Sequence, residues 1–377
     1  MTDSLSSEKT VSLETPGGAA ARSPRLHWEA GSAYDLFISQ VVLHAPERFG
    51  LRASWAAGVR SRLPAEARQA LETARLLFGA PLHWIHALPQ PRDAASALWV
   101  LHQMLPEERL PRLALYPEMN PELQEMLQNV AARRSWMERD LEVLHEARCQ
   151  ERREALRPKP AASILDAWAQ AGAFGEAYLA ALRTYQQVFF AEEEQRIRLA
   201  LQAALEQAQL LAQELELPEV LERLSRGVQI PDLFEKEDLT LVPSYWGAPL
   251  IFLGRLSASH TLLAFGARPA NVSLVPGEWV PEALVQALKA LADPTRLRIL
   301  RYLAGEPLSP TELSRRLRLR APTVTHHLSA LRLAGLVHLT LGPRGERDYS
   351  ARLEAVYALR QQLQEFLEDE GQEGDKL

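Results

Sequence analysis

Residues 280–352 read VPEALVQALKALADPTRLRILRYLAGEPLSPTELSRRLRLRAPTVTHHLSALRLAGLVHLTLGPRGERDYSAR, which predicts four helices followed by two strands. Asp293 and Ser309 each precede a first-turn proline as an N-cap, and Glu312 completes a capping box with Ser309. Gly335 ends the last helix, where a left-handed backbone is common. Beyond it, LVHLTL and ERDYSA flank the turn residues GPRG, as in a β-hairpin. Two short helices joined by a tight turn and followed by a hairpin form a winged helix-turn-helix.

The helix that begins at Ala321 has a small polar face opposite its apolar one. Three apolar residues at helical spacing predict its buried side: Val324, Leu328 and Leu331. The opposite side presents Thr325 and His326, which can hydrogen-bond to base edges. Ala321 and Pro322 on the same side offer only apolar contact to a thymine methyl. Because a helix of this size fits the major groove of double-stranded DNA, we expect these four residues to contact bases.

Basic residues are concentrated in the same stretch. Residues 281–353 hold 12 Lys and Arg against 6 Asp and Glu, whereas the whole chain has a net charge of −6. Positive charge gathered in one small module of an acidic protein is typical of local DNA binding. Any single arginine could equally belong to a solvent-exposed helix face. The prediction of DNA binding therefore depends on all the basic residues of this stretch together. We expect phosphate contacts from Ser309, Thr311, Arg315, Arg316, Arg318, Arg320, Thr323, His327, Arg344 and Arg347, with packing as the alternative for Thr323 and His327.

The motifs ALADPTRLRIL, TVTHHLSAL and LAGLV resemble the ArsR/SmtB family of bacterial transcription regulators, over roughly a fifth of the chain. The resemblance implies a winged helix-turn-helix that reads DNA through the positions named above. It also implies that helices flanking the module pair two subunits into a homodimer. The family often has Ser or Thr where this chain has Arg320, which cannot cap the helix in the same way but can neutralise a phosphate.

Metal sensing at the sites known in that family is not expected here. The resemblance implies cysteines in the helix before the recognition helix, or His and acidic residues on the last helix. The stretch SPTELSRRL has no Cys, and LEAVYALRQQLQEFLEDE has no His. His326 and His327 are adjacent, so they point about 100° apart on a helix and do not suit one shared ion. We therefore predict no metal and no cofactor.

The chain outside the module is predicted to be mainly α with small β. We expect a disordered tail at 1–25, a helical regulatory or dimerisation domain at 26–226, and a short antiparallel β segment at 227–279. The winged module spans 280–353, and 354–377 form a C-terminal helix and acidic tail. The lines YDLFISQVVLHAPERFG, VLERLSRGVQIPD and LTLVPSYWGAPLIF also resemble an uncharacterised helical domain found N-terminal to ArsR-type modules.

The last helix carries an apolar stripe formed by Leu353, Val356, Leu359, Leu363 and Phe366. This stripe predicts subunit pairing, because two-fold DNA sites match two-fold protein symmetry. Alternatively, it packs back on the N-terminal domain of the same chain.

The sequence contains no GxGxxG after a strand, no P-loop, no GxSxG and no HExxH, so we expect no enzyme. His83 and His86 have a spacing that allows shared metal ligation, but packing is the favoured interpretation. A small-molecule effector is possible, and the candidate pocket residues are Phe37, Trp84, Trp99, Tyr178, Phe189 and Trp246. One cysteine, Cys149, excludes intramolecular disulfides, and no signal peptide or membrane span is recognised, so we expect a cytoplasmic protein.

Together these observations predict a sequence-specific transcription regulator, a repressor that acts as a homodimer on double-stranded DNA. The N-terminal domain would sense an unknown signal. Two alternatives stay open: a protein-interaction protein whose winged module is a partner platform, and a small-molecule-binding protein with an attached DNA-binding module.

Overall fold

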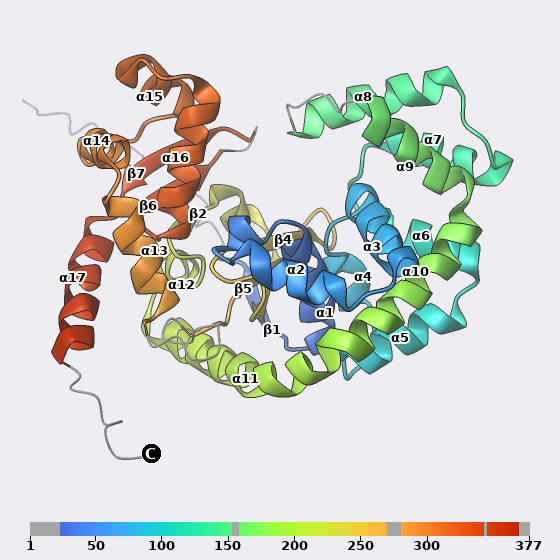
Figure 1. Cartoon of the computed structure of the whole chain (residues 1–377), viewed down its shortest axis with the longest axis horizontal. Coiled ribbons are helices and arrows are strands. Elements are labelled where there is room, and N and C mark those ends of the chain that lie inside the picture. Colours follow the sequence, from blue (N-terminus) through green and yellow to red (C-terminus); the bar gives the residue numbers. More distant parts are fainter. Residues whose placement is uncertain (1–22, 153–157, 270–279, 343–344, 369–377) are drawn as a thin grey trace, which may run out of the picture.

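The computed structural model describes residues 23–152, 158–269, 280–342 and 345–368. It shows a helical body, a small sheet and a C-terminal winged module (Figure 1). The predicted class, mainly α with small β, is confirmed. The predicted tail at 1–25 lies largely outside the described residues, as do the acidic end of the chain and the side chain of Cys149.

Several helices of the body begin at or directly after a proline, which needs no hydrogen-bond acceptor in the first turn. Its helices are α1 (Ser32–His44), α2 (Ala53–Ser61), α3 (Ala65–Leu77), α4 (Leu82–His86), α5 (Ala94–Gln103), α6 (Pro106–Ala114), α7 (Pro121–Arg133), α8 (Glu138–Arg152), α9 (Pro158–Ala169), α10 (Ala171–Tyr185), α11 (Ala191–Glu214) and α12 (Leu217–Leu224). A π-helical turn, η2 (Gln186–Phe190), joins α10 to α11. None of the described helices is both long and apolar enough to span a membrane.

A mixed four-stranded sheet lies beside the helices, in the order β1 (Arg25–Trp28), β3 (Asp238–Ser244), β5 (His260–Gly266) and β4 (Phe252–Arg255). β1, β3 and β5 are parallel, and β4 is antiparallel to β5. The expectation of an antiparallel segment confined to 227–279 is therefore wrong. The first strand of the sheet, β1, comes from the N-terminal end of the described chain, and the helical body forms the crossover between β1 and β3.

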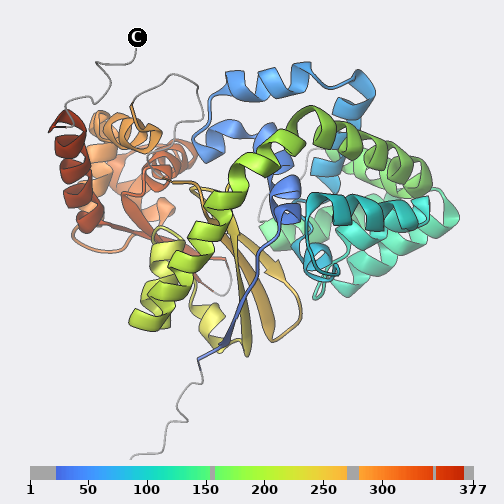
Figure 2. The same ribbon diagram turned by 90° about the horizontal axis from the view of Figure 1, so that it is seen from below.

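Both faces of this sheet are covered, as parallel strands require. Val242 and Leu262 pack into the main core of the helical body, while Leu239 and Leu263 form a second core with α11 and α12. Figure 2 shows α11 lying across the sheet. The buried carboxylate of Asp35, on α1, ties the end of β3 to the body. It accepts hydrogen bonds from the Ser244 hydroxyl at 2.8 Å and from the backbone N–H groups of Tyr245 and Trp246 at 3.2 and 2.8 Å.

The winged module has the predicted elements. They are α13 (Glu282–Leu291), α14 (Pro294–Leu303), α15 (Pro310–Leu317), α16 (Ala321–Leu333), β6 (Val337–Leu341), β7 (Arg347–Ala351) and α17 (Leu353–Glu368). Asp293 caps α14 by accepting from the backbone N–H groups of Thr295 and Arg296. Ser309 and Glu312 form the capping box of α15, and Gly335 has φ 69° after α16. Local sequence signals thus determine the module.

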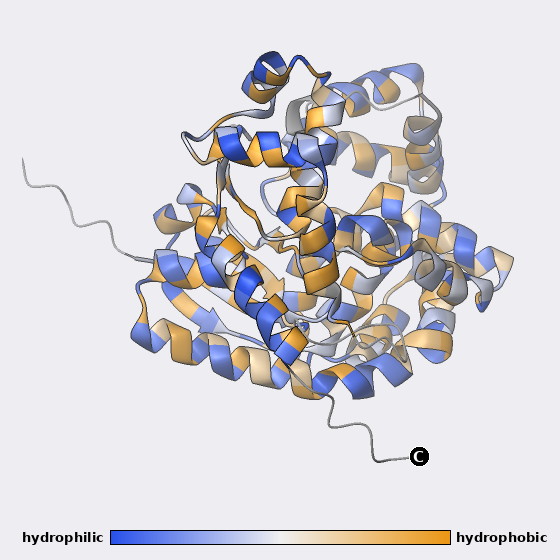
Figure 3. Cartoon of the chain, turned by 60° about the vertical axis from the view of Figure 1, so that its left-hand side comes forward, coloured by the Kyte–Doolittle hydropathy of each residue, from blue (hydrophilic) through white to orange (hydrophobic). Residues whose placement is uncertain are grey.

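The apolar stripe of α17 is divided between two environments. Leu359, Leu363 and Phe366 pack against Leu284 and Ala287 of α13. This contact lies within the winged module, so the alternative of packing on the N-terminal domain is wrong for these residues. Leu353 and Val356 are exposed instead. Figure 3 shows hydrophilic and hydrophobic residues interspersed along the helices of the chain.

The module is attached to the body by a short strand. β2 (Val228–Gln229) follows α12 and pairs in parallel with β6, which makes a three-stranded sheet of order β2-β6-β7. The Leu339 N–H donates to the Gly227 carbonyl at 2.9 Å. The wing is therefore hydrogen-bonded to the segment that follows α12. We expect a movement of α12 to shift β6 as well.

Candidate nucleic-acid interface

The predicted reading face of α16 is open to solvent. Val324, Leu328 and Leu331 are fully buried in the core of the module. The four residues expected to contact bases, Ala321, Pro322, Thr325 and His326, are all exposed. The apolar residues hold the helix against α13, α14 and α15, and the reading face then points outward. A duplex could meet this face without any rearrangement of the module's core.

The hydroxyls on this face are satisfied within the helix. Thr325 Oγ donates to the Ala321 carbonyl at 3.0 Å, and Ser329 Oγ donates to the Thr325 carbonyl at 2.8 Å. Such bonds to the preceding turn are ordinary for Thr and Ser in helices. The oxygen of Thr325 keeps its acceptor capacity, and rotation about χ1 would free the donor. His326, also exposed, adds an imidazole that can donate or accept.

Most of the predicted phosphate contacts surround this face. Thr311, Arg315, Arg318, Arg320, Thr323 and Arg347 are exposed. Arg320 precedes α16 without a side-chain capping bond, as expected from its sequence position. Arg316 is exposed and forms an ion pair with Glu306 at 2.6 Å. Arg344 lies outside the described residues.

Two residues predicted to contact phosphates, Ser309 and His327, also make contacts within the module. The Ser309 hydroxyl takes part in the capping box, and hydrogen bonds from Ser309 hold the pKa of the Glu312 carboxyl below its usual range. His327 points toward the start of α14, with Nδ1 3.9 Å from the Asp293 carboxylate. Packing, the alternative named for His327, fits this position.

Sequence reasoning missed Arg332, which anchors the far side of α16. Its side chain is only 6% exposed, and its guanidinium donates to the carbonyls of Ser225 at 2.7 Å and Arg226 at 2.9 Å. Burial, with repulsion from Arg352 and Arg226, lowers the pKa of Arg332 to about 10. In the sequence, only its position next to Leu331 on the apolar side of the helix indicated that Arg332 is buried. Arg332 therefore joins the recognition helix to the end of α12.

The six aromatic residues proposed for a ligand pocket do not line one cavity. Phe37 packs edge-on against Trp84 at 5.7 Å, and Phe189 lies 5.6 Å from Trp246, so these four fill the core. Tyr178 stacks on Phe174, and Trp99 is 63% exposed.

A larger hollow of about 480 Å³ lies elsewhere in the helical body. Leu77 of α3, Leu123 of α7 and Trp168 of α9 line it, and Arg255 at the end of β4 reaches it from the sheet. Most of the lining side chains are apolar, and His83, Tyr116 and Arg255 add polar groups to the wall. Of the predicted aromatic residues, none borders this hollow.

Comparison with known proteins gives three similarities. A family model described as a helix-turn-helix domain matches residues 291–340. The HTH-type transcriptional regulators CmtR of Mycobacterium tuberculosis and Mycobacterium bovis are 40% identical over 85 residues, which is 22% of this chain and 72% of each relative. A crystal structure described as an ArsR family transcriptional regulator is 28% identical, covers 24% of this chain and 97% of that chain, and has a TM-score of 0.21. These relatives are named as regulators rather than as enzymes.

Proposed function

The chain belongs to the ArsR-like helix-turn-helix transcription regulators, and we propose that it is a cytoplasmic repressor that binds double-stranded DNA at specific sequences. One observation carries the proposal: the reading face of α16 is exposed although the opposite face is completely buried. The outer side chains of this helix lie in solvent, within reach of a partner. Thr325 and His326 are therefore available to a partner.

In the proposed mechanism α16 enters the major groove with its N-terminal end toward the bases. Thr325 and His326 read base edges, and Ala321 and Pro322 contact thymine methyl groups. Arg315 at the end of α15, and Arg318 and Arg320 in the turn before α16, hold phosphates, as does Arg347 of the wing. They supply most of the affinity, whereas the two polar residues of α16 supply the preference for sequence.

We further propose that the regulator is a homodimer paired through α17. The exposed side of this helix carries Leu353, Val356 and Tyr357, of which Tyr357 is 73% exposed. Leu288 of α13 is also exposed. Contiguous exposed apolar residues are typical of interaction sites. A two-fold axis beside α17 would present two copies of α16 to a pseudo-palindromic operator.

The N-terminal body is proposed to be the sensor. Its attachment to the module through β2 and Arg332 means that a ligand-induced shift of α12 would move β6 and α16 together. The hollow lined by Trp168 is where a small apolar effector would fit best. Changing the separation of the two recognition helices would then change the affinity for the operator.

The test is selection from a library of randomised duplexes, followed by titration of the recovered site by fluorescence anisotropy. Thr325→Ala and His326→Ala should each weaken binding by roughly 5- to 150-fold, which corresponds to about 1–3 kcal/mol per lost base contact. Two matched controls lie in the helical body. Thr184 makes the same bond to the preceding turn as Thr325, at 3.0 Å, and His102, like His326, is exposed.

Unchanged affinity and unchanged site preference in the α16 variants would refute the assignment. Binding that is independent of both sequence and salt would instead support a protein-interaction platform, because phosphate contacts must produce a salt dependence.

A further inference from the structure

The hollow of about 480 Å³ in the helical body has a wall that can cover a hydrocarbon chain. Its volume falls within the range of roughly 300–1,000 Å³ that small-molecule sites occupy. Leu123 and Leu127 of α7 and Ile164 of α9 line it with buried side chains. Leu253 of β4 also lines the hollow, yet it is 44% exposed. An apolar ligand would remove this side chain from water, which favours binding.

A single positive charge stands on this wall. Among the described residues that line the hollow, Arg255 is the one that is charged at neutral pH. His83 is the other basic side chain of the wall. Burial lowers the pKa of its imidazole, and its Nε2 lies 3.3 Å from the Arg112 carbonyl. His83 is therefore neutral at neutral pH, and a ligand in the hollow meets the charge of Arg255 alone.

Close packing of β4 on α4 brings Arg255 to the hollow. A Cβ at the preceding residue, Gly254, would come within 2.7 Å of Leu82 Cβ, so a larger residue there would push the strand away from the helix. The Arg255 side chain is 63% exposed, and its Nη1 lies 3.8 Å from the Glu118 carboxylate. This separation exceeds the 2.7–3.2 Å or so of a hydrogen bond. The pair with Glu118 therefore leaves the guanidinium donors available to a ligand.

We propose that the hollow binds a carboxylic acid with a hydrocarbon chain, its chain against Leu123, Ile164 and Leu253 and its carboxylate on Arg255. A planar guanidinium holds a carboxylate through two parallel N–H···O bonds. A phosphate dianion fits less well, because it would meet one positive charge and the nearby Glu118. The regulatory meaning of this site rests on the proposed sensor role of the body, whereas binding of the acid does not depend on DNA.

The experiment titrates decanoic acid into the full chain by calorimetry, at neutral pH and without DNA. Decanol, of the same chain length, is the uncharged comparison ligand. Arg255→Met should weaken binding of the acid roughly tenfold and leave binding of the alcohol unchanged. Arg25→Met is the matched control, because Arg25 is 74% exposed, is paired with Asp238 and lies on β1 at the opposite edge of the same sheet. An equal change for both ligands, or no change for either, would overturn the proposal.

Two further measurements do not depend on a loss of binding in a damaged variant. Glu118→Gln removes the competing carboxylate and should strengthen binding of the acid about two- to fivefold, a gain that misfolding does not produce. Unchanged or weaker binding would contradict the place of the carboxylate. Decanoic acid brominated at the end of its chain should quench tryptophan fluorescence, and Trp168→Phe should remove most of this quenching. Quenching that persists in full would exclude the hollow as the site.

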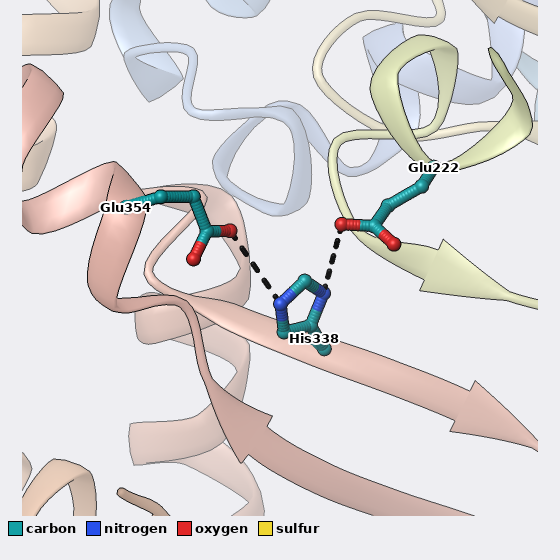
Figure 4. Close-up of side chains that lie close together, drawn as sticks. All are labelled: Glu222, His338 and Glu354. Atoms are coloured by element: carbon teal, nitrogen blue, oxygen red, sulfur yellow. Dashed lines mark ion pairs between the residues drawn. The ribbon is translucent and has the colours of Figure 1, made fainter. Parts of the chain in front are cut away.

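The contact between the body and the winged module provides a control away from the hollow. His338 of β6 stands between Glu222 of α12 and Glu354 of α17, with Nδ1 3.7 Å and Nε2 3.5 Å from the two carboxylates (Figure 4). None of these three described residues lines the hollow. Glu222→Gln should therefore bind decanoic acid like the wild type, and a tenfold loss would overturn the location of the site.

The sensor role is tested separately from the site. In the wild type, saturating decanoic acid should change the affinity for the selected DNA duplex by at least about fivefold, measured by fluorescence anisotropy. The same acid should have no effect on DNA binding by Arg255→Met at that concentration. Binding of the acid without any change in DNA affinity would uphold the site and overturn the sensor role.

Discussion

Arg332 offers a direct test of how the recognition helix is attached to the body. In Arg332→Met, an apolar stem of similar length remains, but the hydrogen bonds to the Ser225 and Arg226 carbonyls are lost. Hydrogen bonds from a charged donor are worth about 1.5–3 kcal/mol each, so two contribute about 3–6 kcal/mol. The lowering of the Arg332 pKa from 12.5 to about 10 corresponds to about 3 kcal/mol of unfavourable free energy for holding the charged guanidinium in this buried place. The uncharged Met side chain does not have this unfavourable term.

The net effect should be a weakening of the attachment by about 1–3 kcal/mol, because two carbonyls are also left without donors. The assay is hydrogen exchange of the Leu339 amide, which donates to the Gly227 carbonyl across the β2–β6 pair. Its exchange should accelerate by roughly 5- to 150-fold. Arg301→Met, at an exposed position on α14, is the control. If exchange at Leu339 is the same in both variants, Arg332 does not hold the module to the body.

Three further predictions concern other parts of the molecule. Burial raises the pKa of the Asp35 carboxyl from 3.8 to about 6, so the folded state binds this proton more tightly than the unfolded state. Stability from this group is therefore present at low pH and lost as pH rises through about 6. Relative to Asp35→Asn, wild type should gain up to about 3 kcal/mol in unfolding free energy between pH 7 and pH 4, measured by urea denaturation. Asp293→Ala removes the cap of α14 and should cost about 1 kcal/mol in the same assay, whereas an unchanged midpoint would contradict the cap's role. If the proposed dimer pairs through α17, Tyr357→Asp should give a monomer in light scattering without changing the circular dichroism, and a dimer that persists would exclude this face of α17.

The winged module could be predicted closely because its signals are local. The Asp293 and Ser309 caps, and Gly335 with φ 69°, each act within a few residues of the chain. The exposed side of α16 also followed from periodicity alone. Sequence patterns of this kind record which face of one helix is apolar, and this is sufficient for a small module with a single core.

Features that depend on distant partners could not be predicted. β1 has only four residues, and its partner β3 begins at Asp238, across the whole helical body. Arg332 and His338 look like ordinary module residues until α12 and β2 are placed against them. The same limit explains the pocket prediction, because a list of aromatic residues does not say which ones pack against each other, as Phe37 and Trp84 do.

The central claim is that the open side of α16 lies in the major groove of the operator. Dimethyl sulfate probing of guanine N7 on the selected duplex tests it most directly, since this atom is reached only from the major groove. We predict protection in two major-groove segments about one helical turn apart, and loss of that protection in the Thr325→Ala, His326→Ala double variant. Tight binding of the wild type with every guanine N7 still reactive would contradict the claim.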